Sequence, residues 1–252
     1  MRLLLDLGNT RLKWALASAN GWSARGALAW NDDVPTALAS AWRDMPRPAR
    51  VVGASVVDAA READVEKIVA GTFARDVTWV RTPAEACGVR NAYAEPQRLG
   101  VDRFLAMVAA HAAGHAPCVL AGIGTALTLD ALGADGTHLG GLIAPGPLLM
   151  QQSLLGATAR VRPAQAGAIR DIADNTADAV ASGCWLAAAA LVERFARRIA
   201  EQSSKTAVRL LLDGGDADLL LPLLTVPGEL AADSVLRGLL VWADAHPAAT
   251  AP

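Results

Sequence analysis

Two segments of the 252-residue chain share one pattern: an apolar run, a short turn that contains a glycine, and a second apolar run. The first covers residues 3–17 with its turn at Gly8, and the second covers residues 119–132 with its turn at Gly124. Apolar runs of this length around a polar turn are typical of β-hairpins. Setting one glycine over the other superposes the two hairpins, and the order of the expected elements recurs, so the sequence predicts a duplicated α/β unit.

Each half has the order strand, strand, strand, helix, strand, and the first two strands are those of the hairpin. In the first half we expect strands at 3–7, 12–17, 23–30, 51–57 and 77–80 and helices at 34–45 and 61–73. In the second we expect strands at 119–123, 127–132, 139–143 and 208–212 and helices at 147–155 and 176–200. We therefore divide the chain into halves at 1–116 and 117–252. The alternative is two unrelated hairpins, because α/β chains contain many such turns.

Composition limits the kinds of partner. With 53% hydrophobic and 19% charged residues the chain can bury a substantial core. Its net charge is −2, its pI is near 6.1, and no basic run interleaves with aromatic residues, so nucleic acid is not an expected partner. The apolar stretch around His111 is interrupted by Pro117 before it reaches the roughly 18 residues of a membrane span. The amino terminus lacks the features of a signal peptide. We expect a cytoplasmic protein without a membrane partner.

The first turn has the residue types that suit a polyphosphate. Asp6 ends the first strand, Gly8 lets the backbone approach phosphate oxygens closely, and Thr10 with the turn amides can donate hydrogen bonds. Asp6 would hold Mg²⁺ rather than phosphate, and Lys13 adds positive charge. The alternative is an Asx-type turn that only closes the hairpin. Thr125 supplies a hydroxyl at the matching place in the second hairpin.

A second candidate site is Gly100-Val101-Asp102-Arg103, which opens an expected helix. An acid in the first turn of a helix ordinarily interacts with the helix dipole and does nothing more. The neighbouring guanidinium adds another reading, because it can fix an anionic substrate while Asp102 accepts a proton.

Two glycine-rich stretches follow expected strands, at residues 140–146 and 213–216. Ligands of α/β proteins commonly bind beyond the carboxyl ends of strands, which is where Gly214 and Gly215 lie. Simple turns are the alternative in both places.

Taken together, the short motifs resemble those of type III pantothenate kinases, in the fold group of acetate kinase, sugar kinases, Hsp70 and actin. The resemblance covers nearly the whole chain and rests on DLGNTRLKW, GVDR, GTALTLD, GGLIAPG, NTADAVASG and the late GG. It implies two actin-like, ribonuclease H-like halves with a nucleotide cleft between them, and a homodimer. The implied reaction is ATP-dependent phosphorylation of pantothenate to 4'-phosphopantothenate, the first step of coenzyme A biosynthesis.

The resemblance also implies a role for particular residues. The ATP site would include Asp6, Leu7, Gly8, Asn9, Thr10, Arg11, Leu12, Lys13, Thr125, Gly214 and Gly215, with Asp6 at the metal. The pantothenate site would include Tyr93, Gly100, Val101, Asp102, Arg103 and Thr176, with Asp102 as the general base.

One departure concerns cations. Many members of the resembled family have an Asp that helps to hold an activating monovalent cation, K⁺ or NH₄⁺, where this chain has Gly122. A cation site made of carbonyl groups and water stays open. Two other functions also stay open: a kinase of the same fold for another small hydroxyl compound such as a sugar, and a regulatory protein that kept the fold without catalysis.

Overall fold

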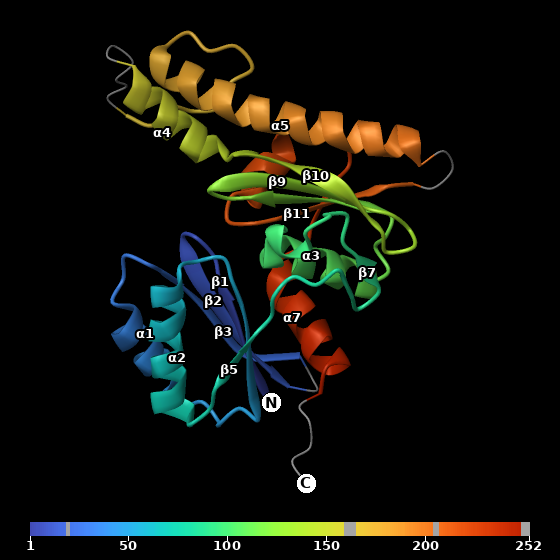
Figure 1. The fold of residues 1–252 in the computed structure, drawn as a ribbon. Coiled ribbons are helices and arrows are strands. Elements are labelled where there is room, and N and C mark those ends of the chain that lie inside the picture. Colours follow the sequence, from blue (N-terminus) through green and yellow to red (C-terminus); the bar gives the residue numbers. More distant parts are fainter. Residues whose placement is uncertain (19–20, 159–164, 204–206, 248–252) are drawn as a thin grey trace. The chain divides into compact units, whose positions relative to one another are not determined.

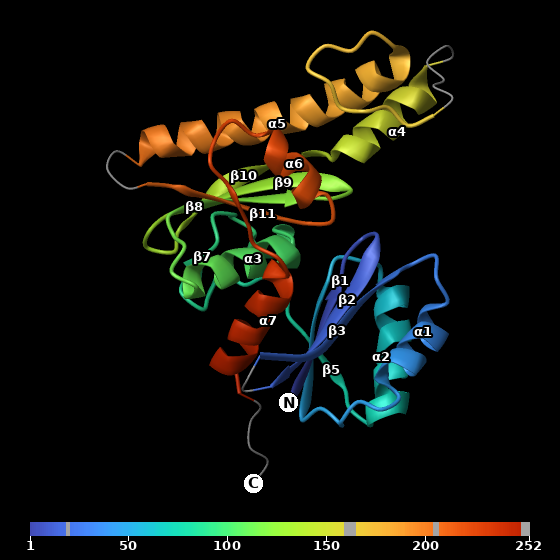
Figure 2. The same cartoon turned by 180° about the vertical axis from the view of Figure 1, so that it is seen from behind.

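The computed structural model describes residues 1–18, 21–158, 165–203 and 207–247. The contacts within the chain divide it into two compact units. One unit is Met1–Gly114 together with Ser234–Pro252, and the other is His115–Asp233. Each unit is built on a five-stranded sheet that packs against helices (Figures 1 and 2).

The first unit has strands, short 3₁₀ helices (η) and α-helices. In chain order these are β1 (Arg2–Leu7), β2 (Arg11–Ser18), β3 (Gly21–Ala29), α1 (Val34–Trp42), β4 (Arg50–Ser55), α2 (Ala59–Phe73), β5 (Val77–Trp79), β6 (Glu85–Ala86), β7 (Val89–Arg90), η1 (Pro96–Arg98), α3 (Val101–Ala112) and α7 (Ser234–Ala245). The sheet order is β3-β2-β1-β4-β5, and β6 and β7 form a separate hairpin. β1 is antiparallel to β2 and parallel to β4.

β1 is apolar almost throughout because both faces of its sheet are covered. Leu3, Leu5 and Leu7 pack in the cluster that contains side chains of α1 and α2. Leu4 points to the other face and packs with side chains of α3 and α7. Alternate residues of a strand point to opposite faces, so one short run supplies two cores.

The last helix belongs to the first unit, whereas the sequence-based division placed it in the second half. α7 packs along α3, and Gly238 is the point of closest approach. A Cβ atom at Gly238 would lie 2.0 Å from the carbonyl oxygen of Leu105. The break near Gly114 agrees with the expected boundary, but the apolar face of α7 could not be assigned to a sheet from periodicity alone.

The second unit repeats the topology of the first. Its elements are β8 (Cys118–Ile123), β9 (Ala126–Leu132), β10 (His138–Pro145), α4 (Pro147–Ala157), α5 (Thr176–Gln202), β11 (Arg209–Asp213), α6 (Ala217–Leu220), η2 (Leu221–Leu223) and β12 (Glu229–Leu230). The sheet order is β10-β9-β8-β11-β12, with β8 antiparallel to β9 and parallel to β11. The predicted fold class, a duplicated α/β unit, is confirmed.

Among the described helices, α5 is long and apolar enough to cross a membrane by length and composition. This helix corresponds to the one expected at 176–200. Trp185, Ala188 and Val192 on α5 are buried against strands of the second sheet. These side chains form the face of α5 that packs in the core of the second unit.

Candidate functional site

The first candidate site is the turn that joins β1 to β2. The side chain of Asp6 is nearly buried and lies opposite Lys13 in the antiparallel register. The Gly8 N–H group donates to the Arg11 carbonyl at 3.0 Å, and a Cβ atom at Gly8 would lie 3.3 Å from the same oxygen. Asn9, which follows, is exposed. The turn is therefore tight, with an acid on its inner side and polar groups on its outer side.

Trp30 holds this turn, and the sequence analysis did not identify it. Its indole N–H donates to the Gly8 carbonyl at 2.7 Å, and its backbone N–H donates to the Thr10 carbonyl at 3.3 Å. The guanidinium of Arg61 lies over the indole ring, 5.1 Å from its centre. Trp30 directly follows β3, and the last residue of β3, Ala29, pairs with Arg11 at the start of β2. The signal in the sequence was this position, at the end of the expected strand 23–30 and next to the turn.

The second candidate site is at the start of α3. Gly100 is the N-cap residue, and the Asp102 carboxylate lies in the first helical turn, where its Oδ1 accepts the Arg103 N–H at 2.8 Å. A Cβ atom at Gly100 would lie 2.5 Å from the same Oδ1 atom. Glycine therefore leaves the space that the carboxylate occupies. The side chain of Val101 is buried in the core beneath.

Arg103 is 7% exposed, which is unusual for an arginine. Its Nη1 donates to the Tyr93 hydroxyl at 3.3 Å, and its guanidinium lies 5.9 Å from the centre of the Tyr93 ring. The structure thus brings Tyr93 together with Arg103, next to Asp102. A carboxylate, a forked cation and a phenol converge at one helix start.

The start of α3 lies at the same sheet edge as the turn after β1. β1, β4 and β5 are parallel, so their carboxyl ends share one edge. Shortly beyond β5, the buried Thr82 hydroxyl donates to the Leu99 carbonyl at 2.7 Å, one residue before Gly100. Ligand sites of α/β sheets usually lie at this edge.

In the second unit three glycine-containing loops meet at the carboxyl end of β8. The Gly146 N–H group donates a hydrogen bond to the carbonyl of Thr125 in the Gly124–Thr125 turn, at 2.9 Å. A Cβ atom at Gly146 would lie 1.8 Å from the Gly124 carbonyl oxygen. Thr125 itself is exposed. Glycine is required at position 146 because the backbone there packs directly on the backbone of Gly124.

The loop after β11 joins the same place. Gly214 has φ +108°, and a Cβ atom there would lie 2.1 Å from the Ile123 carbonyl oxygen. Asp216 donates its backbone N–H to that oxygen at 3.2 Å, and burial raises the pKa of its carboxyl group. Gly214 and Gly215 are exposed, so a flat part of a ligand can lie directly on the backbone.

The structure gives a reason for Gly122, where the resembled family has an Asp. Gly122 pairs with Thr128 on β9, and a Cβ atom at Gly122 would lie 2.6 Å from the Thr128 hydroxyl oxygen. The threonine side chain therefore fills the space that a larger residue would need. Thr176, the remaining predicted substrate residue of this unit, is the exposed first residue of α5, after the N-cap Asn175.

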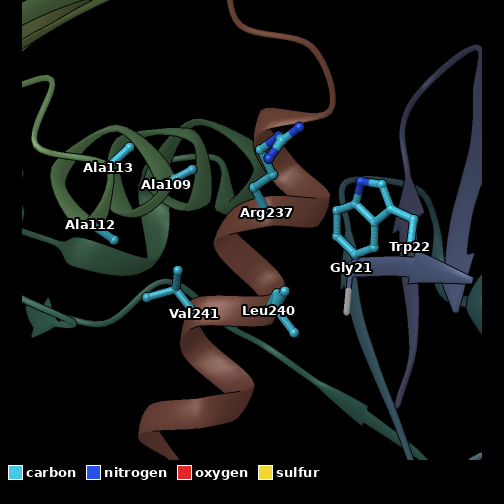
Figure 3. Close-up of a pocket in the computed structure, with 8 residues that line it drawn as sticks. All are labelled: Gly21, Trp22, Ala109, Ala112, Ala113, Arg237, Leu240 and Val241. Carbon is cyan, nitrogen blue, oxygen red and sulfur yellow. The ribbon is translucent and has the colours of Figure 1, made fainter. Parts of the chain in front are cut away.

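The first unit also has a pocket, of about 460 Å³, which no predicted site residue lines. Figure 3 shows Arg237, Leu240 and Val241 of α7 facing it, with Trp22 of β3 and alanines of α3 on the other sides. Gly21 begins β3 and pairs with Ser18, the last residue of β2. Asp6 pairs with Lys13 near the other end of β2. The pocket is therefore separate from the candidate site.

Comparison with known proteins points to one family. A model of the family described as type III pantothenate kinase matches residues 2–198. The type III pantothenate kinase of Aromatoleum aromaticum is 40% identical over 243 residues, which are 96% of this chain and 98% of that protein. That of Xanthomonas oryzae pv. oryzae is 44% identical over 245 residues, with 96% and 97% covered.

A solved structure is similar in fold. A protein from Sinorhizobium meliloti, assigned as a 2-dehydro-3-deoxygalactonokinase, superposes with a TM-score of 0.62 and 14% identity. The match covers 100% of this chain and 99% of that one, and it bears on the fold alone. The family match and the two relatives above identify the protein more closely: the chain belongs to the type III pantothenate kinase family.

Proposed function

We propose that the protein transfers the γ-phosphoryl group of ATP to the primary hydroxyl of pantothenate, giving 4'-phosphopantothenate and ADP. The observation that carries the proposal is the group formed by Tyr93, Asp102 and Arg103 at the carboxyl edge of the first sheet. Pantothenate has the matching chemistry, a carboxylate for a guanidinium and a hydroxyl for a base. The 40–44% identity to relatives named as type III pantothenate kinases supports the same substrate.

In the proposed mechanism Asp102 is the general base. Its carboxylate accepts the proton of the pantothenate hydroxyl while the hydroxyl oxygen bonds to the γ-phosphorus of ATP, and the bond from that phosphorus to the bridging oxygen breaks to release ADP. Arg103 pairs with the pantothenate carboxylate and Tyr93 orients Arg103. Gly100 and Val101 supply the backbone that lines the site in the first unit. In the second unit Thr176 is the proposed hydroxyl contact to pantothenate. Positioning and charge account for most of the catalysis in phosphoryl transfer.

The ATP contacts follow the two glycine-containing turns. In the first unit the residues from Asp6 to Lys13 are the proposed phosphate contacts. In the second unit Thr125 is a proposed phosphate contact, and Gly214 and Gly215 are the proposed contacts to the adenosine. Among the described residues no cluster of three or more His, Cys, Asp or Glu side chains could hold a metal ion. This fits Mg²⁺, which usually takes one or two carboxylates and the substrate phosphates. Mg²⁺ at Asp6 would neutralise charge on the phosphates.

We also propose that a monovalent cation, K⁺ or NH₄⁺, is at most weakly required. The charged ligand is replaced by Gly122, and the Thr128 hydroxyl fills the nearby space. Carbonyl groups could still bind such a cation. Turnover measured in K⁺, NH₄⁺ and Na⁺ at equal ionic strength tests this, and a loss of more than about tenfold in Na⁺ would contradict it.

A homodimer is the proposed assembly, with the edge strand β10 and helix α4 as its surface. Large exposed hydrophobic side chains gather on these two elements: Leu139, Leu142, Ile143, Leu148 and Leu154. An uncovered apolar sheet edge is a typical interface. Ile143→Glu should convert a dimer to a monomer in light scattering. A dimer of unchanged stability in that variant would exclude this surface.

The proposal places the enzyme in the cytoplasm, with no nucleic-acid or membrane partner, in keeping with a net charge of −2. The test of the function is ADP release from ATP with a panel of acceptors. Pantothenate should support turnover, and a hexose should not. Efficient turnover of a hexose with none of pantothenate would assign the protein to another kinase activity, and no turnover with any acceptor would favour a regulatory role.

A further inference from the structure

The segment between β5 and α3 carries Tyr93 but has little regular structure of its own. It contains only the short hairpin β6–β7 and the 3₁₀ turn η1. A substrate-binding side chain on such a segment needs other contacts to fix it, because loops without them have many conformations. The contacts of one residue, Asn91, meet this need.

The Asn91 side chain bonds to three backbone groups of the segment. Its Oδ1 accepts the Tyr93 N–H at 3.0 Å. Its Nδ2 donates to the Pro96 carbonyl at 3.1 Å and, more weakly, to the Pro83 carbonyl at 3.4 Å. The Asn91 backbone N–H donates to the Ala84 carbonyl at 2.9 Å. Asn91 therefore joins the beginning of the segment, its end and the backbone of Tyr93.

Through Tyr93 these bonds reach the proposed substrate site. The Tyr93 hydroxyl accepts from Nη1 of Arg103, and the Asp102 carboxylate accepts the Arg103 backbone N–H. Arg103 is nearly buried, so its guanidinium has few alternative positions. A shift of the Tyr93 backbone would remove the hydroxyl that orients Arg103, while the start of α3 would stay attached to Thr82.

We infer that Asn91 is a positioning residue that sets the affinity for the carboxylated acceptor by holding Tyr93 against Arg103. The inference rests on the proposed function, since it takes Arg103 as the group that binds the pantothenate carboxylate. Asn91 lies outside the motifs that carry the family resemblance, and it does not touch the reacting atoms.

The test compares Asn91→Ala with Gln97→Ala, an exposed residue of the same segment. Loss of the bond to Tyr93 should raise the KM for pantothenate by about tenfold in Asn91→Ala, while the KM for ATP changes by less than about twofold. Gln97→Ala should change neither constant. A purely structural role would lower the melting temperature and the active fraction and leave the KM for pantothenate unchanged, which would overturn the inference.

A double-mutant cycle with Tyr93→Phe tests the path through Tyr93. If Asn91 acts by placing the Tyr93 hydroxyl, the effects of Asn91→Ala and Tyr93→Phe on the KM for pantothenate should not add. Additive effects would contradict the inference. If Asn91→Ala does not fold, Asn91→Leu serves instead, since it has a similar shape and loses the bond from the Tyr93 N–H group as well as both donated bonds. It should raise the same KM, and an unchanged KM would overturn the inference.

Failure of the proposed function would look different. Wild-type protein that does not phosphorylate pantothenate, and does not bind it in calorimetry, would contradict the function itself. Wild-type protein that turns over pantothenate, with an Asn91→Ala variant of unchanged KM, would contradict the positioning role alone.

Discussion

The Arg103 guanidinium donates to the Tyr93 hydroxyl at 3.3 Å while the Arg103 backbone N–H donates to the neighbouring Asp102 carboxylate at 2.8 Å. One residue therefore connects the proposed carboxylate-binding group to the proposed base. The guanidinium can hold the phenol with one nitrogen and present others to an anion, which an ammonium group on a flexible stem does less well.

Arg103→Lys should raise the KM for pantothenate by about tenfold or more, because the charge remains but the planar fork is lost. The KM for ATP should stay close to that of the wild type. Steady-state kinetics with each substrate varied in turn will measure both constants. Arg98→Lys is the control, since Arg98 pairs with Glu95 at the surface of the same segment. Equal constants in Arg103→Lys and the wild type would remove Arg103 from the substrate site.

Gly214→Ala should be strongly unfavourable and Gly215→Ala nearly neutral, although the two residues are adjacent. A methyl group at Gly214 would meet the Ile123 carbonyl at 2.1 Å with φ at +108°, whereas a Cβ atom at Gly215 meets nothing within 4 Å. The cost at Gly214 should be at least about 2 kcal/mol of unfolding free energy.

Urea denaturation of the two glycine variants measures this difference, and ATP titration shows whether the loop still binds nucleotide. We expect weaker ATP binding in both variants, because both glycines lie against the adenosine in the proposed site, and a loss of stability in Gly214→Ala alone. Equal stabilities for the two variants would show that the loop after β11 does not pack on Ile123 as described.

Glu62→Gln should lower stability at neutral pH and have less effect in acid. Arg81 donates two hydrogen bonds to the Glu62 carboxylate, at 2.7 and 3.0 Å, and holds the pKa of Glu62 below its ordinary value of 4.5. A lowered pKa in the folded state stabilises the protein above the ordinary value, and this contribution is lost as the pH falls through the folded value. Because Arg81 is largely exposed, we expect at most about 1 kcal/mol at neutral pH.

Urea denaturation of Glu62→Gln and wild type at a series of pH values checks the sign. The difference should shrink as the pH falls below about 4.5. Glu95→Gln, which removes an exposed pair with Arg98, is the matched control and should have little effect. A difference that is constant with pH would show that the ion pair does not contribute.

The fold was predictable because its signal is local and repeated. The two hairpins around Gly8 and Gly124 each showed their strands and turn, and the same order of elements in both halves indicated one topology used twice. The place of α7 was not predictable, because its partner α3 lies more than a hundred residues earlier in the chain and Gly238 gives no sign of which backbone it approaches.

The candidate site was predictable where its residues are adjacent in sequence. Asp102 and Arg103 share one helix turn, so their proximity follows from the sequence. The contributions of Trp30 and Asn91 depend on bonds to backbone groups of Gly8, Tyr93 and Pro96, and the side-chain type alone does not show which carbonyl or N–H group it meets. Trp30 and Gly8 are 22 residues apart, so their bond has no local sequence pattern.

The most direct test of the account is turnover of Asp102→Asn with ATP and pantothenate, measured by ADP release alongside nucleotide binding. The amide has the shape of the carboxylate but cannot accept the hydroxyl proton as a base. We predict that kcat falls by at least about a hundredfold while the Kd for ATP stays within about twofold of the wild type. A variant with near-normal kcat would contradict the assignment of Asp102 as the base.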